Sequence, residues 1–159
     1  MGDGARIQST DFIGGVGGFY VARPGAPRGG DRFGYQAMLG ANLHAFVDEY
    51  RSFRVILAGT AGREEAVSAN SESLTTVGGA VEAHFAAFPP VVYLGAGVNP
   101  RAVIFDSGRS PEFELGIFGR VSATFGHVGF SLNVGTGLRL GDIERSSVEV
   151  GLGAFVNLF

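Results

Sequence analysis

The sequence predicts an all-β fold, an eight-stranded antiparallel up-and-down barrel. Apolar and polar residues alternate with a period of two along most of the chain, which places them on opposite faces of strands. The 27 glycines interrupt almost every window that could form a helix. The length of 159 residues indicates one domain, residues 1–159, with a polar N-terminal segment over 1–10.

Eight segments carry the alternation. In the first, glycines occupy both faces, so its two sides differ least. In the second, every second residue from Phe33 to Val47 is apolar, whereas the residues between are small or polar. The third, fourth and fifth segments repeat this pattern. The eight expected strands are 11–23, 33–48, 52–62, 73–88, 91–104, 112–125, 128–141 and 147–159.

The last three segments have the clearest faces. In the sixth, Phe113, Leu115 and Ile117 lie opposite the polar residues of the same strand, and the seventh has the same contrast. The eighth places its even-numbered residues on one apolar face as far as Leu158, and ends on Phe159. A regular strand at a chain end is unusual, because termini generally carry polar residues and fray.

The connections alternate in length. Tight turns follow the second, fourth and sixth strands, and longer polar loops follow the first, third, fifth and seventh. The longest loop is expected over 62–72 and would expose Arg63, Glu64 and Glu65 to solvent. Tight turns and both termini at one end, with longer loops at the other, are typical of an up-and-down barrel.

The apolar face is predicted to point outward into a lipid bilayer. The polar face is rich in Gly, Ala, Ser and Asn, which suit the crowded interior of an eight-stranded barrel. A water-facing exterior would carry many lysines and glutamates, yet the chain has no lysine. No apolar run is long enough for a membrane-spanning helix, which needs roughly 18 residues. The predicted fold is therefore a transmembrane barrel.

Aromatic residues on the apolar face support this orientation, because they gather towards the strand ends. Two aromatic girdles around an apolar band are typical of membrane barrels. One group falls at the tight-turn end and the other at the loop end: Phe53, Phe85, Phe125 and Phe130, then Phe33, Tyr35 and Phe113. A soluble, lipocalin-like barrel with the apolar face inward is the alternative.

In strand pattern and loop asymmetry, the chain resembles the small outer-membrane barrels of the OmpA/OmpX type. The resemblance covers nearly the whole chain and implies a location in the outer membrane of a Gram-negative cell. It also implies that Phe159 acts as the signal that the outer-membrane assembly machinery recognises. Phe159 shares its face with Glu149 and Asn157, whereas the terminal aromatic of that family usually faces lipid.

The polar face predicts a lumen with four charges of each sign. Balance is expected because an unpaired charge in a narrow lumen is costly. The residues are Arg54, Arg101, Arg120 and Arg139, with Glu82, Glu112, Glu114 and Glu149. They are expected to fill and neutralise the lumen; a gate that opens by exchange of partners, as proposed for OmpA-like barrels, is the alternative.

Estimated hairpin registers predict two tiers of ion pairs. The tier near the loops contains Arg139 opposite Glu149 and Arg101 close to Glu114. The deeper tier contains Arg54 opposite Glu82. Glu82 also reaches Arg120 across Gly95 and Gly97, because glycine has no side chain to block the path.

Several kinds of chemistry are not expected. There is no cysteine for disulfides or thiol catalysis, and no Lys/Arg cluster for nucleic acid. The third expected strand lies between the strands that carry His44 and His84, so these side chains do not converge and we expect no metal site. The sequence contains no cofactor-binding motif. His127, Ser131 and Asn133 share a face, but the outer-membrane lipid A deacylases place His and Ser two residues apart and near lipid.

The sequence therefore predicts a small, non-enzymatic outer-membrane barrel with a structural or surface-interacting role. Its partners are the lipid bilayer and the assembly machinery, and it is expected to be a monomer. Residues 1–10 are polar where an export signal would stand, and that signal is expected to have been removed. The alternatives are a lipocalin-like carrier or sensor of small apolar ligands and a membrane-embedded lipid-modifying enzyme.

Overall fold

The computed structural model describes residues 6–22, 30–48, 51–67, 72–88, 91–140 and 146–158, without the side chains of 6–9, 45–48 and 51–52. The strands within these ranges are β1 Arg6–Ala22, β2 Arg32–Asp48, β3 Arg51–Ala66, β4 Leu74–Phe88, β5 Val92–Phe105, β6 Glu112–Phe125, β7 Val128–Arg139 and β8 Ser147–Leu158. No helix in the described part of the chain is long and apolar enough to cross a membrane.

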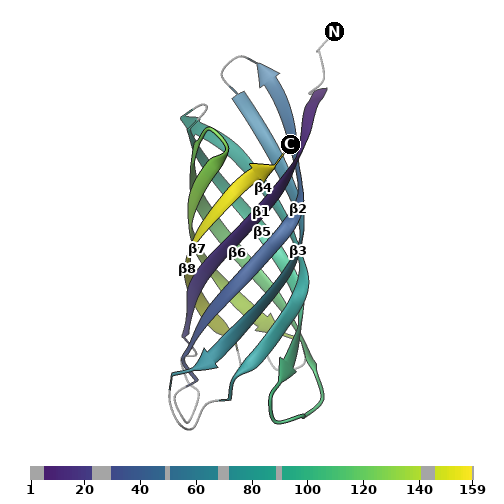
Figure 1. Ribbon diagram of the computed structural model, residues 1–159, viewed down its shortest axis with the longest axis vertical. Helices are drawn as coiled ribbons and strands as arrows, with labels where there is room; N and C mark the ends of the chain where they lie inside the picture. Colours follow the sequence, from purple (N-terminus) through teal and green to yellow (C-terminus); the bar gives the residue numbers. More distant parts are fainter. Residues whose placement is uncertain are drawn as a thin grey trace.

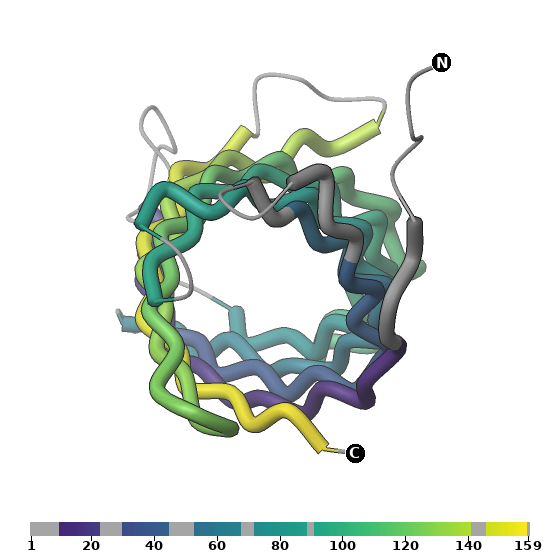
Figure 2. The backbone as a smooth tube through the Cα atoms, turned by 90° about the horizontal axis from the view of Figure 1, so that it is seen from above, coloured from purple at the N-terminus to yellow at the C-terminus, as the bar shows by residue number. Residues whose placement is uncertain are grey.

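The strands form one closed antiparallel barrel in sequence order, which confirms the predicted fold class. β1 closes the sheet by pairing with β8, from Phe12 opposite Leu158 to Ala22 opposite Val148. The strands tilt around a long axis in Figure 1, and the view along that axis in Figure 2 shows the closed ring. Closure leaves the sheet without an unpaired edge strand.

The two faces of the barrel wall have opposite chemistry. Every strand carries exposed apolar side chains on its outward face, for example Val16, Leu39 and Leu152, each more than 60% exposed. Inward side chains include buried arginines, glutamates and asparagines. This distribution follows from the period-two alternation of the sequence, and it is inverted relative to a water-soluble domain, in which apolar side chains fill the interior.

The outward aromatic residues lie where the sequence analysis predicts them. Phe53 packs on Phe85 of the neighbouring strand with ring centroids 5.0 Å apart. The rings of Phe125 and Phe130 are exposed near the β6–β7 turn, and Phe33, Tyr35 and Phe113 are exposed towards the other end. The apolar wall is thus bordered by aromatic side chains at both ends.

The strands differ from the predicted ranges mainly at β1 and β3. β1 begins at Arg6, inside the segment expected to be a polar extension. β3 continues through Ala66, so the prediction of a solvated loop at Arg63, Glu64 and Glu65 is wrong. Because side chains alternate along a strand, Glu64 points inward and is 1% exposed, whereas Arg63 and Glu65 point outward.

Candidate functional site

The candidate site is the charged lumen. The eight predicted charges face it, and two further residues join them: Arg32 at the start of β2 and Glu64 near the end of β3. Both have the parity of the polar face of their strand, so extending the alternation past the predicted strand ends would have found them. Five arginines and five glutamates of the described residues thus share the lumen.

Seven of these residues form a cluster near the loop end, here called the loop-end cluster. Arg101 lies at its centre and is 4% exposed. Its guanidinium contacts Glu114 of β6 and Glu149 of β8 directly. The Nη2 atom of Arg101 also lies 3.9 Å from Oε1 of Glu64 on β3. The members are Arg32, Glu64, Arg101, Glu112, Glu114, Arg139 and Glu149.

Arg139 pairs with β6 rather than with β8. Its Nη1 lies 2.6 Å from Glu112 and its Nε 3.3 Å from Glu114. The predicted register of Arg139 opposite Glu149 is wrong, because β7 and β8 place Glu149 opposite Gly135. Glu149 instead contacts Arg101 of β5 across the lumen.

The deep cluster lies towards the tight-turn end and consists of Arg54, Glu82, His84 and Arg120. Arg120 Nη1 lies 2.6 Å from Glu82 Oε2, and the register places Glu82 opposite Gly97 and Arg120 opposite Gly95. The structure thus brings Glu82 and Arg120 together over the two glycines.

Arg54 is not opposite Glu82, which corrects the predicted pairing. Its opposite residue is His84, whose Nε2 lies 2.9 Å from Glu82 and takes the place expected for Arg54. The sequence analysis treated His84 as a separate lumen histidine and missed this contact.

The Arg54 guanidinium is held by neutral groups. It is 2% exposed, donates from Nη2 to Ser122 Oγ at 2.8 Å, and lies 4.0 Å from the centre of the Tyr93 ring. No carboxylate of the described residues lies within ion-pair distance. A π face is a favourable partner for a desolvated guanidinium.

Apolar side chains pack next to the loop-end cluster. Leu74, Val103 and Phe105 form a fully buried apolar cluster there. The Phe105 ring lies 3.3 Å below the guanidinium of Arg109, which also pairs with Glu112. The same ring lies 5.4 Å from the guanidinium of Arg139, so the apolar cluster packs against the loop-end cluster.

On the outer side of the wall, the β5–β6 loop is bound to β3. Arg63 makes a two-pronged contact with Asp106, with distances of 2.8 and 2.6 Å. These hydrogen bonds hold the pKa of Asp106 below its ordinary value. The stabilisation is therefore present above the ordinary pKa of an aspartate and is lost as the pH falls through the lowered pKa of Asp106.

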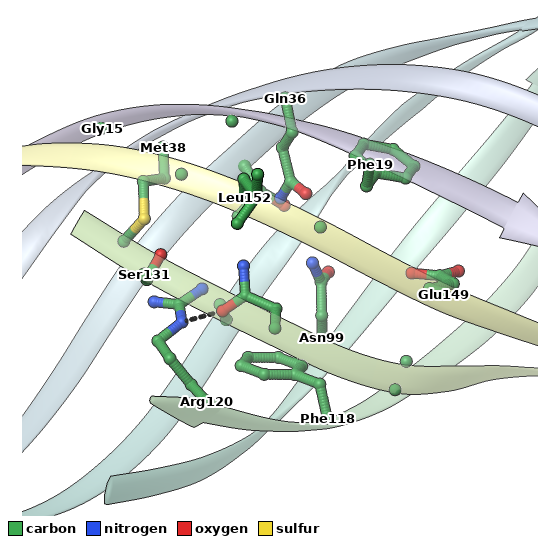
Figure 3. Close-up of a pocket in the computed structure, with 18 of the residues that line it drawn as sticks. Gly15, Phe19, Gln36, Met38, Asn99, Phe118, Arg120, Ser131, Glu149 and Leu152 are labelled. Carbon is green, nitrogen blue, oxygen red and sulfur yellow. Dashed lines mark hydrogen bonds between the residues drawn. The ribbon is translucent and has the colours of Figure 1, made fainter. Parts of the chain in front are cut away.

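A cavity of about 100 Å³ separates the two clusters. Figure 3 shows Asn99 between Arg120 on one side and Glu149 on the other. The β1 and β8 side of the cavity is lined by glycines, including Gly17 and Gly151. The cavity thus borders both clusters, with Arg101 and Glu149 of the loop-end cluster and Glu82 and Arg120 of the deep cluster among its lining residues.

The remaining candidate residues from the sequence analysis do not come together in one site. His127 is exposed in the β6–β7 turn, Ser131 is buried in the lumen, and Asn133 accepts a hydrogen bond from Arg120 at 2.5 Å. No group of three potential metal ligands occurs among the described residues. Phe159, the predicted assembly signal, lies outside the described residues.

No protein-family model and no curated protein matches the chain. Among solved structures, the crystal structure of Neisserial surface protein A is similar, with 18% identity, coverage of 98% of this chain and 100% of that chain, and a TM-score of 0.58. Ail, the attachment invasion locus protein of Yersinia pestis, solved with the heparin analogue sucrose octasulfate, aligns at 12% identity over 93% and 96% of the two chains with a TM-score of 0.47. The first likeness shows the fold, that of a small eight-stranded closed β-barrel.

Proposed function

We propose that the protein is an integral outer-membrane barrel with a structural or surface-interacting role. The observation that carries this proposal is the inverted wall, with apolar side chains outside and ion pairs inside. Exposed apolar patches on soluble monomers rarely exceed a few hundred Å², whereas here every strand contributes exposed large apolar side chains. A bilayer is the environment in which such a surface is stable.

The same inversion argues against the alternative of a carrier for apolar ligands. A lipocalin-like carrier encloses its ligand in an apolar lumen. In this barrel the central cavity is small and borders Arg101, Glu82 and Glu149. Burying an apolar ligand against these charges would remove their hydrogen-bonding environment without compensation.

A non-enzymatic role is part of this proposal. Nine of the ten charged lumen side chains are engaged in ion pairs, and the tenth, Arg54, is held by Ser122 and the Tyr93 ring. The bilayer and the outer-membrane assembly machinery are the proposed partners, and the monomer is the proposed state because closure already satisfies the edges of the sheet.

Solubility tests this proposal directly. The refolded protein should need detergent to remain dispersed, and it should migrate differently on a gel when left unheated, because the closed barrel resists the denaturing detergent. Its circular dichroism should be rich in β-strand. A monodisperse, folded monomer in plain buffer would contradict the proposal and favour the soluble barrel.

Transport provides a second prediction. In a planar bilayer the protein should show no large, stable conductance, because eight strands leave an interior that side chains can fill and both charged clusters obstruct the path. Single-channel recording checks this. Well-resolved openings on the nanosiemens scale would refute a filled lumen.

A further inference from the structure

A groove of about 340 Å³ lies on the outer wall, over β1, β2, β3 and β4. These four strands lie side by side in the sheet, as Figure 1 shows. The floor of the groove contains Ala37 and Ala61, which are opposite each other in the β2–β3 ladder, and Val16 of β1 lies beside them. All three side chains are exposed. The groove is here called the outer groove.

The outer groove changes from apolar to polar along the strands. Tyr35, Arg63 and Thr75 are neighbours on β2, β3 and β4, and all three line the groove. They lie two residues from the alanine floor, about 7 Å along a strand, on the side towards the loops. A lipid of the loop-side leaflet has the same order, with its chain towards the bilayer centre and its head towards the loops.

The polar edge keeps three hydrogen-bond donors for a ligand. Arg63 has five N–H groups, of which four donate to Glu65, Thr75 and Asp106, so one on Nη2 remains. The Thr75 hydroxyl accepts from Arg63, which leaves its own proton to donate elsewhere. The Tyr35 hydroxyl has no hydrogen-bond partner among the described residues. Phosphate oxygens are acceptors and suit these three donors.

The charge beside these donors is negative. Glu65 and Asp106 do not line the groove, but both lie within 2.8 Å of Arg63, past its polar edge. The three side chains together carry one net negative charge. The two carboxylates are 51% and 46% exposed, and each of their oxygens can accept a further hydrogen bond. They oppose a purely anionic head and favour one that also carries an ammonium group.

We propose that the outer groove binds a lipid of the loop-side leaflet whose head carries both a phosphate and a primary ammonium. One acyl chain lies over the alanine floor. The phosphate accepts hydrogen bonds from the three donors of the polar edge, and the ammonium pairs with the two carboxylates beyond it. This assignment rests on the proposed function, because only a barrel within a bilayer presents the groove to lipid.

Native mass spectrometry tests the assignment on the intact protein, released from detergent micelles that contain one added phospholipid. Three lipids with the same acyl chains are compared. Phosphatidylethanolamine has the primary ammonium, phosphatidylcholine has an ammonium without N–H, and phosphatidylglycerol has none. The fraction of protein with one bound lipid should be highest for phosphatidylethanolamine, by about threefold, the scale of an exposed ion pair. Equal binding of the three lipids, or a preference for phosphatidylglycerol, would overturn the site.

Matched variants locate the binding. Ala61→Leu fills the floor and should abolish the preference, whereas Ala96→Leu, at an exposed position of β5 outside the groove, should preserve it. Tyr35→Phe combined with Thr75→Val removes two donors and should weaken binding of all three lipids. Glu65→Gln should reduce the preference for phosphatidylethanolamine over phosphatidylglycerol. An undiminished preference in Ala61→Leu would show that the lipid binds elsewhere and would overturn the assignment.

The shift in gel migration of the unheated protein shows that each variant has folded. A folded protein that stays monodisperse in buffer without detergent would contradict the proposed function. A barrel that requires detergent but has no preference among the three lipids would contradict only the outer groove.

Discussion

Replacing Arg101 with alanine is expected to destabilise the barrel by about 3–5 kcal/mol, the range for removing one partner of a buried ion pair. We expect the upper end, because Arg101 lies within ion-pair distance of three glutamates at once: Glu64, Glu114 and Glu149. Without it, Glu149 has no remaining cation within ion-pair distance among the described residues. Urea titration of the folded protein in detergent micelles measures the change.

Two comparisons show whether the loss is electrostatic. The double variant Arg101→Ala with Glu149→Gln should recover part of the stability, because it removes the negative charge that the loss of Arg101 leaves unpaired. Ser110→Ala, at an exposed loop position, should change stability by less than about 0.5 kcal/mol. If Arg101→Ala were no worse than Ser110→Ala, the loop-end cluster would contribute nothing to folding.

Arg120→Ala is expected to cost about 3 kcal/mol or more, within the range for a broken buried pair. Glu82 would keep His84 at 2.9 Å but lose its guanidinium partner, and Arg54 does not reach it. The change should also enlarge the central cavity, which Arg120 lines. The free energy of unfolding by urea again gives the measurement.

A double-mutant cycle separates this pair from general damage. Glu82→Ala and Arg120→Ala, alone and combined, should give a coupling energy above about 1 kcal/mol, because residues in one ion-pair network are not additive. A coupling indistinguishable from zero would show that the two side chains do not interact in the lumen.

The sequence predicts the face of each lumen residue well because the side-chain period of a strand is two. A slip of one residue would transfer every apolar side chain to the wrong side of the wall. The alternation therefore assigned Arg54, Glu82 and Arg120 to the interior although their partners were not all known.

Register is predicted less well, because a slip of two or four residues preserves every face. Across the tight β4–β5 turn, Glu82 was correctly placed opposite Gly97. Across the longer β3–β4 and β7–β8 connections, the predictions for Arg54 and Arg139 were displaced by two and four residues. Loop length does not fix how far two strands continue, so the pattern cannot detect these shifts.

Strand ends are predicted poorly where both faces are polar. At the end of β3, Arg63 and Glu65 point outward while Glu64 points inward, so the hydrophobic alternation vanishes although the strand continues. The same loss of contrast concealed Arg32, which lies one residue before the predicted start of β2.

Depth-resolved fluorescence tests the central claim, that the apolar face of the wall contacts lipid. The chain contains no tryptophan, so Ile117→Trp and Phe118→Trp each introduce a single reporter at adjacent positions of β6. Ile117 is 42% exposed on the outer wall, whereas the Phe118 ring lies inside the barrel, 5.2 Å from the guanidinium of Arg120. In vesicles of lipids brominated on their acyl chains, the account predicts strong quenching for Ile117→Trp and weak quenching for Phe118→Trp. Equal quenching of both variants, or stronger quenching of Phe118→Trp, would contradict it.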